Sequence, residues 1–412
     1  MNEASRRSAE EEEEEVIFQP NTPEFFANPH LQYRALRLRE PVYAVPDSNS
    51  WLVTRYDNVV HILKDGRFGK RLDSSGKPKE IEEDIKPAVE LLDLFMLFRD
   101  PPDHTRLRGL VSKAFTPRMI DTLVPRIQAV TNELLEELAE REEAELVAQF
   151  AFPLPVIVIA EMLGVPAQDR QKFKDWSNLL ARLIDYQAPR KLFVEGSQVV
   201  LEITEYLKSI IAERRLNPQN DLISGLIRAE ENDQKLTENE LIASCVLLLV
   251  AGHETTVNLI ANGVYTLLTH PEQLRLLQDR RELLSGAIEE VLRYESPIQM
   301  TSRLALTDVT IGGRTISRGQ EVLPVIGAAN RDPEIFADPD RFDITRQPNL
   351  HLAFAAGIHY CLGAALARAE GQVAIGSLLR KFPRLTLADQ EIVWREMVVF
   401  RSLSQLKVSL SR

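Results

Sequence analysis

The chain has 412 residues, of which 44% are hydrophobic and 27% are charged, which is the composition of an ordinary globular protein. Its formal net charge of −12 disfavours nucleic acids and anionic membranes as partners, because both bind basic surfaces. The two cysteines, Cys245 and Cys361, are too few for a disulfide framework and suit a reducing cytoplasm, where we expect the protein to reside.

The N-terminal segment contains an acidic run from Glu10 to Glu15. Like charges in such a run repel one another, so residues 1–16 are predicted to form a disordered acidic tail. No signal peptide is expected, because no apolar core follows the first positive charges. The longest apolar stretch, Cys245 to Ala251, is far shorter than the ~20 residues that cross a bilayer. Residues 17–412 are predicted to form a single domain, because no internal repeat or Gly/Ser linker divides them.

The first part of this domain has a mixed pattern. A short strand is predicted at 51–54 and the start of a helix at 56–63. A charged segment at 74–86, interrupted by glycine and proline, is typical of a loop, and an apolar patch follows at 91–98.

Helical periodicity dominates from residue 101 to about residue 382, with proline and glycine at the breaks. Short strands are predicted at 309–313 and 321–326, and again near Val398 and Leu406. The predicted fold class is therefore mainly α with a minor β part.

One predicted helix differs from the others in length and polarity. A capping box at Thr237–Glu240 begins it, and no proline interrupts it before Thr269. About 30 residues at 1.5 Å each span roughly 45 Å, the width of a whole domain. The segment Leu247–Gly252 is apolar on every side, which predicts a core position, yet His253–Thr256 is polar. Polar chemistry directly after the most buried section indicates a functional site.

The strongest local signal surrounds Cys361, in the segment Phe354–Arg368. Gly357 permits a tight turn, and Gly363 lets the backbone come close to whatever the sulfur binds. Cys361 stands just before a predicted helix, whose free N–H groups and partial positive charge favour a thiolate. Such a thiolate suits a ligand of haem iron, whereas Cys245, within an apolar helix, is interpreted as a small buried side chain.

The pattern Phe354-x-x-Gly-x-His-x-Cys361-x-Gly closely resembles the haem-ligand signature of the cytochrome P-450 superfamily, and the resemblance extends from about Pro23 to Leu410. It implies haem b with Cys361 as the thiolate ligand of the iron. It also implies a fold that holds the haem between a long central helix and the cysteine loop, with Phe354, Gly357 and Gly363 at the cofactor.

The polar segment Ala251–Thr256 of the long helix resembles the oxygen-activation groove of this family, with Ala251 beside the haem. The resemblance places an acid, Glu254, and an alcohol, Thr255, side by side over the iron as the catalytic pair. Independently of the family, Thr255 can bond to a carbonyl one helical turn back and help to hold water. Oxygen activation requires protons, which an acid and an alcohol together can relay.

Three further motifs match the family in order. His104 and Arg108 lie four residues apart on one helix face and match its propionate ligands, as do Arg303 and His359. Glu290 and Arg293 resemble its structural salt bridge, whose third member is either Arg341 or Arg346; the sequence leaves that choice open.

The resemblance implies a monooxygenase that inserts one atom of O2 into an apolar small molecule. Electrons from NAD(P)H would arrive through a separate ferredoxin-type or flavodoxin-type protein with its reductase, with Arg106 and Lys113 as possible contacts. A monomer is expected. Two alternatives remain, a peroxygenase driven by H2O2 and a non-catalytic haem sensor or carrier. Glu254 and Thr255 argue against both.

The predicted substrate pocket is mainly apolar, which suits a terpenoid, a steroid, a fatty acid or a macrolide-like polyketide. The sequence does not choose among these four. The predicted wall residues are Phe95, Phe98, Leu247, Leu248, Ile298, Gln299 and Phe400.

Overall fold

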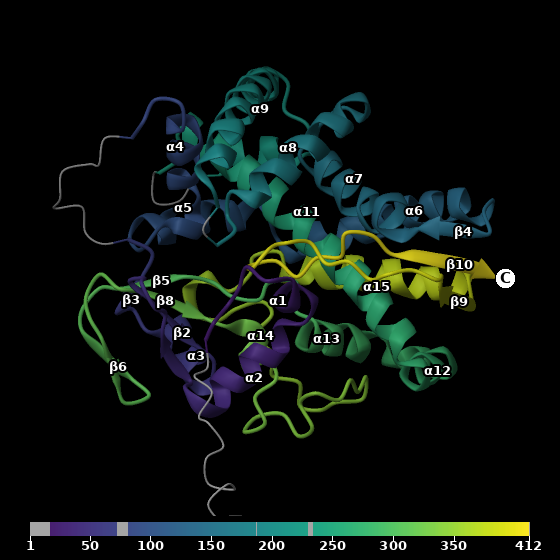
Figure 1. Cartoon of the computed structure of the whole chain (residues 1–412). Coiled ribbons are helices and arrows are strands. Elements are labelled where there is room, and N and C mark those ends of the chain that lie inside the picture. Colours follow the sequence, from purple (N-terminus) through teal and green to yellow (C-terminus); the bar gives the residue numbers. More distant parts are fainter. Residues whose placement is uncertain (1–16, 72–80, 187, 230–233, 412) are drawn as a thin grey trace, which may run out of the picture.

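The computed structural model describes residues 17–71, 81–186, 188–229 and 234–411. The predicted acidic tail, 1–16, lies outside this part, as does most of the predicted loop at 74–86. The described chain is mainly helical with small sheets, which confirms the predicted fold class (Figure 1).

The helices include the predicted long one, α11, and the one that follows the cysteine, α15. Their bounds in chain order are α1 Pro23–Ala27, α2 Pro29–Arg39, α3 Tyr56–Lys64, α4 Lys86–Leu94, α5 Asp103–Ala114, α6 Pro117–Ala139, α7 Pro153–Met162, α8 Arg170–Arg182, α9 Arg190–Leu216, α10 Leu222–Arg228, α11 Glu238–Thr269, α12 Pro271–Asp279, α13 Leu284–Tyr294, α14 Ile326–Ala329 and α15 Ala364–Lys381.

The strands are short and fall into three sheets. Their bounds are β1 Val42–Ala44, β2 Ser50–Val53, β3 Phe68–Gly69, β4 Glu143–Glu145, β5 Arg303–Ala305, β6 Val309–Ile311, β7 Arg314–Ile316, β8 Glu321–Pro324, β9 Arg384–Leu387 and β10 Lys407–Ser411. The first sheet has the order β1-β2-β8-β5-β3, the second β4-β10-β9, and β6 pairs with β7. Within the first sheet β2 and β8 are parallel, which joins the N-terminal region to the segment before the cysteine loop.

A strand predicted near Val398 does not form. This stretch makes only an isolated bridge, between Phe400 and Ile298. The backbone N–H groups of Val398 and Val399 donate instead to the carboxylate of Asp185, the latter at 2.7 Å. A side chain from the region between α8 and α9 therefore takes the donors that a neighbouring strand would have used.

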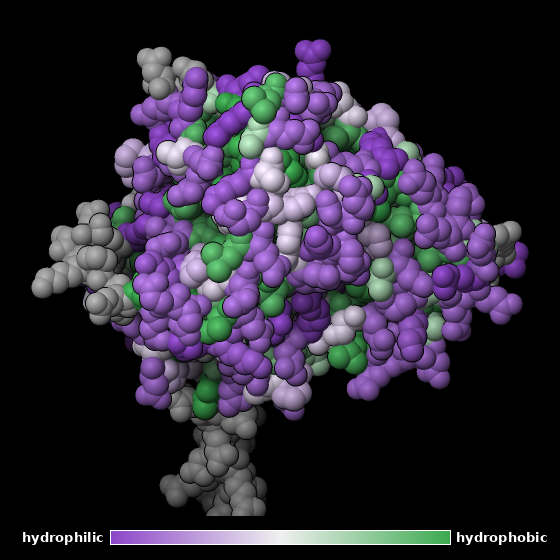
Figure 2. Space-filling view, turned by 90° about the horizontal axis from the view of Figure 1, so that it is seen from above, coloured by the Kyte–Doolittle hydropathy of each residue, from purple (hydrophilic) through white to green (hydrophobic). Residues whose placement is uncertain are grey.

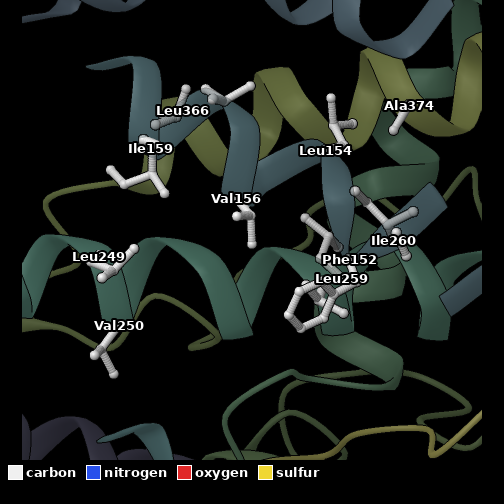
Figure 3. Packing of buried hydrophobic residues seen from close by; sticks show 14 of the residues in the cluster. Phe152, Leu154, Val156, Ile159, Leu249, Val250, Leu259, Ile260, Leu366 and Ala374 are labelled. Atoms are coloured by element: carbon white, nitrogen blue, oxygen red, sulfur yellow. The ribbon is translucent and has the colours of Figure 1, made fainter. Parts of the chain in front are cut away.

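Helix α11 runs through the middle of the molecule, as its apolar middle predicts (Figure 1). Its N-terminus has the predicted capping box, in which Thr237 and Glu240 satisfy each other's backbone N–H groups. Helices α7, α8 and α15 pack against it. Figure 3 shows this core at close range, with Leu249 and Ile260 of α11 beside side chains of α7 and α15.

By length and composition, α11 is the one helix in the described ranges that could cross a membrane. Yet 72% of its most apolar window is buried inside the protein. This burial is typical of the central helix of a folded core. The face of the molecule in Figure 2 is mostly polar, with apolar side chains scattered over it.

Candidate active site

A cavity of about 530 Å³ lies between α11 and the cysteine loop. The N-terminal part of α5, the 3-10 turn Met96–Phe98, strand β5, the start of α15 and the loop at Phe400 contribute to its wall. Cys361 lines the cavity, whereas Cys245 is buried within α11 away from it. The structure thus places one of the two cysteines where a ligand can reach it.

The cysteine loop is shaped by its two glycines. Gly357 has φ +71°, and a Cβ atom there would collide with the Leu63 carbonyl oxygen of α3, so the predicted tight turn requires glycine. The N–H of Cys361 donates to the Phe354 carbonyl at 3.0 Å, which closes the loop. Gly363 is the N-cap of α15, so the cysteine lies directly before the helix, as predicted.

The environment of the thiol combines opposing effects. Burial raises the pKa of Cys361, while the Gly363 N–H group and the guanidinium groups of Arg108 and Arg368 act to lower it. The helix N-terminus therefore favours the thiolate, as the sequence indicated, but burial is the larger effect. A cationic metal centre on the sulfur would offset the cost of burying the charge.

The four predicted propionate ligands meet at one edge of the cavity, its cationic edge. His104 and Arg108 come from α5, Arg303 from β5 and His359 from the cysteine loop, and all four line the cavity. The rings of His104 and His359 are 4.3 Å apart, centroid to centroid. Burial and the neighbouring cations lower the pKa of His359 to about 2. A cluster of this kind needs an anion.

The hydrogen bonding of this cluster shows that it can hold carboxylates. Neither ring nitrogen of His104 has a partner among the described residues, although the side chain is buried. Arg303 is 3% exposed and, within the described part of the chain, donates only to neutral oxygens, the nearer being the Ser302 carbonyl at 2.8 Å. Buried donors of this strength are normally paired, so the site fits the two carboxylates of a haem.

On the opposite wall, α11 presents a stripe of small and apolar residues. Thr255 lines the cavity and donates its hydroxyl to the Ala251 carbonyl at 2.7 Å. Thr256 makes the same bond to Gly252 at 2.9 Å. The Thr255 oxygen keeps its acceptor capacity toward the cavity, where it can hold a water molecule.

Glu254 does not lie over the cavity, so the expectation of an acid and an alcohol side by side is wrong. Its buried carboxylate accepts from Arg395 Nη1 at 2.6 Å and from the Ser402 hydroxyl at 3.3 Å. Consecutive helical residues point about 100° apart. When Thr255 faces the cavity, Glu254 therefore faces the C-terminal loop, the segment between β9 and β10 that contains Arg395 and Ser402. No sequence pattern had pointed to Arg395 as the partner of Glu254.

The cavity wall also contains titratable residues that were not singled out from the sequence, among them Lys70 and Glu370. Lys70, directly after β3, lies at the cationic edge. Glu370 of α15 is 2% exposed, hydrogen-bonded to Thr256, and burial raises its pKa to about 8. The sequence feature that could have pointed to Glu370 as a cavity residue is its position on the helix after Cys361, nine residues further along the chain.

Most of the residues predicted for the substrate wall line the cavity. Phe98, Leu247, Leu248, Ile298 and Phe400 all line the cavity. They form its apolar part, and Phe98 among them lies next to the cationic edge, with Lys70 Nζ 5.8 Å from the centre of its ring.

Two predicted wall residues are wrong. Phe95 is buried behind Phe98, with the two rings stacked at 6.4 Å. Gln299 turns into the protein and donates to the Ser296 carbonyl at 2.7 Å. The segments that contain the predicted wall residues have apolar side chains on more than one face. The sequence alone therefore could not show which of these side chains face the cavity.

The structural salt bridge is fully buried and separate from the cavity. Glu290 and Arg293 pair at 2.8 Å with neither side chain exposed. Arg346 is the third member, with its Nε 3.2 Å from both Glu290 oxygens. Arg341 contributes only its carbonyl, which accepts from Arg293 at 3.0 Å, while its side chain reaches the solvent.

Comparison with known proteins agrees with this geometry. Residues 52–401 match the family model described as cytochrome P450. The biotin biosynthesis cytochrome P450 of Bacillus subtilis is 45% identical over 391 residues, which are 94% of this chain and 97% of that protein. The polyketide biosynthesis cytochrome P450 PksS of the same species is 40% identical, covering 97% of this chain and 100% of the relative.

Solved structures give the same result. The crystal structure of P450BioI in complex with an acyl carrier protein ligated to hexadec-9Z-enoic acid has a TM-score of 0.88 at 44% identity and covers 94% of this chain and 99% of its own. CYP109E1 from Bacillus megaterium, in complex with testosterone, has a TM-score of 0.83 at 36% identity, with coverages of 93% and 100%. These matches, together with the cavity beside Cys361, show that the chain belongs to the cytochrome P450 family and is a monooxygenase that carries haem on a cysteine thiolate.

Proposed function

We propose that this enzyme inserts one oxygen atom of O2 into an apolar small molecule, by hydroxylation or epoxidation, using electrons delivered by a separate protein. The observation that supports this most is the division of the cavity into a cationic edge and an apolar wall. The haem, when bound, supplies the reductive activation of O2. The chain must then orient the substrate, exclude water and supply protons.

We assign the proton supply to Thr255 and Glu254 as two separate positions. Thr255 holds a water at the cavity wall through its free acceptor sites. Glu254 faces Arg395, whose side chain is 29% exposed, so this pair connects the interior of α11 to the solvent. A proton passing from solvent by Glu254 to the water at Thr255 requires a change in the Glu254 side chain, because its carboxylate faces away from the cavity.

The substrate is proposed to be a lipid-like molecule. The apolar wall is formed by aliphatic and aromatic side chains of α11, the Met96–Phe98 turn and the loop at Phe400. Relatives and structural neighbours are named for a vitamin D(3) 25-hydroxylase and for complexes with myristic acid, testosterone and an acyl carrier protein. The first substrates to test are therefore a fatty acyl group, free or on a carrier protein, a steroid, a terpenoid and a polyketide.

We propose that a ferredoxin-type or flavodoxin-type donor, reduced by its reductase, docks over the cysteine loop. Ile358 and Tyr360 are 53% and 44% exposed there, which offers a short path to Cys361. Arg106 does not support docking, because its guanidinium is engaged by Glu240, with one contact at 3.2 Å. We also propose that the enzyme is a monomer and that it is cytoplasmic, and the cysteine usage supports the second point.

The decisive experiment combines binding and turnover. Each substrate class is titrated into the haem-loaded enzyme and followed by the spectral shift that accompanies displacement of water from the iron. The ligand that binds is then incubated under 18O2 with NADPH, a surrogate ferredoxin and its reductase, or with H2O2 alone. Label in the product only with the electron donor supports the proposal. Product from peroxide alone indicates a peroxygenase, and binding without product under either condition indicates a sensor or carrier.

A further inference from the structure

Lys70 brings an ammonium group into the cationic edge of the cavity. It directly follows β3, and its Nζ donates to the Ser302 carbonyl at 2.9 Å. Nowhere in the described ranges does a carboxylate form an ion pair with it. An ammonium group has three donors, so Lys70 keeps donors that the protein leaves unused.

The backbone fixes this position firmly. The N–H groups of Lys70 and Arg71 donate to the carboxylate of Asp100, at 2.8 and 3.0 Å respectively to Oδ2. Asp100 is thereby occupied with backbone donors, which explains why it does not pair with the ammonium group. The guanidinium of Arg71 binds the Phe98 carbonyl at 3.0 Å, so the same short segment also holds the substrate wall.

The sheet places Lys70 opposite another cation. Strands β3 and β5 are antiparallel with Gly69 across from Leu304, so the next pair in register is Lys70 and Arg303. Like charges directly opposite each other are destabilising. Burial and the nearby Arg303 lower the pKa of Lys70 well below its usual value. The cluster therefore has a strong requirement for an anion between these side chains.

We propose that the Lys70 ammonium group binds a carboxylate of the haem together with Arg303, and that its positive charge makes the iron easier to reduce. The proposal rests on the haem of this family and on neither the substrate nor the electron donor suggested above. Because Asp100 and Arg71 join Lys70 to the Phe98 wall, the same contact couples the seating of the haem to the substrate pocket.

Lys70→Met tests this by removing the charge at similar side-chain volume. Lys70→Arg keeps the charge, and Lys191→Met is the control, since Lys191 is 87% exposed on α9. Each haem-loaded variant is measured for ferric haem transfer to excess apomyoglobin and for its ferric/ferrous midpoint potential. We expect haem transfer from Lys70→Met to be about tenfold faster or more, because a hydrogen bond to a charged group contributes at least that factor. Its potential should also become more negative, while Lys70→Arg and Lys191→Met stay close to the wild type.

A parallel titration with myristic acid and tetradecanol separates the other possible anion, a substrate carboxylate. Weaker binding of the acid alone in Lys70→Met, with haem transfer and potential unchanged, would overturn the proposal in favour of a substrate contact. A lower melting temperature with an unchanged potential would overturn it in favour of a packing role. Faster haem loss and a lower potential, both reversed by Lys70→Arg, would support it.

Discussion

Glu254 and Arg395 form an ion pair of 2.6 Å between the middle of α11 and the C-terminal loop, 141 residues apart in the chain. The carboxylate is 1% exposed, whereas the arginine reaches the solvent. The neighbouring Thr255 faces the cavity instead. The acid and the alcohol thus belong to two different environments, which gives their replacements different expected effects.

Thr255→Ala should bind haem and substrate and accept electrons, yet lose coupling. Without the hydroxyl, the water at the cavity wall is poorly held, so more O2 should be released as H2O2. General acid catalysis of this kind contributes ~10²–10⁴ in rate. Product, peroxide and NADPH consumption measured together give the coupling ratio. Thr269→Ala, which removes the same kind of hydroxyl-to-carbonyl bond at the exposed end of α11, should leave the ratio unchanged.

Glu254→Gln should slow proton-dependent turnover without removing the packing of the side chain. The amide can still accept from Arg395 but cannot release a proton at neutral pH. We expect a lower rate of product formation and a larger solvent deuterium isotope effect than in the wild type. If both Glu254→Gln and Thr255→Ala keep normal coupling, protons reach the site by another route.

Cys361→Ser should abolish the red-shifted Soret band that a thiolate-ligated haem shows in its reduced, CO-bound form. The physical reason is that sulfur alone supplies this ligand field, and Cys361 is the cysteine that lines the cavity. Cys245→Ala is the matched control and should keep the band, because Cys245 is buried inside α11. A normal band in Cys361→Ser would contradict the assignment.

Arg346→Met should destabilise the protein far more than Arg341→Met. Arg346 is 10% exposed and lies 3.2 Å from the fully buried Glu290, whereas the Arg341 side chain is 64% exposed. Removing one partner of a buried pair costs ~3–5 kcal/mol, and an exposed pair contributes ~0–1 kcal/mol. Urea unfolding followed by circular dichroism measures the difference. Equal losses in the two variants would show that Arg346 is not the third member of this network.

Glu370 should make the free energy of unfolding depend on pH. Its pKa is raised from 4.5 to about 8 in the folded protein, so the folded state holds a proton that the unfolded state releases. This contribution is fully present below pH 4.5 and is lost as the pH rises toward 8. Glu370→Gln, which remains neutral, should show a flatter profile over this range in urea unfolding at several pH values. An unchanged slope would mean that Glu370 is already ionised in the fold.

The predictions that came from short stretches of sequence agree best with the structure. The capping box at Thr237, the turn at Gly357 and the spacing of His104 and Arg108 are local patterns, and each has the predicted position. The position of Cys361 before a helix is equally local. The backbone rules that govern them act over four residues or fewer, so the sequence suffices.

What only the tertiary structure decided concerns the direction of side chains. The sequence could not choose between Arg341 and Arg346, and it did not indicate that Lys70 joins the cationic edge or that Glu254 turns to Arg395. An apolar helix such as α11 is buried on every side, so hydrophobic periodicity does not identify the face that meets the cavity. That face is set by partners distant in the sequence, such as Arg395, 141 residues from Glu254, whose contacts exist only once the elements have packed.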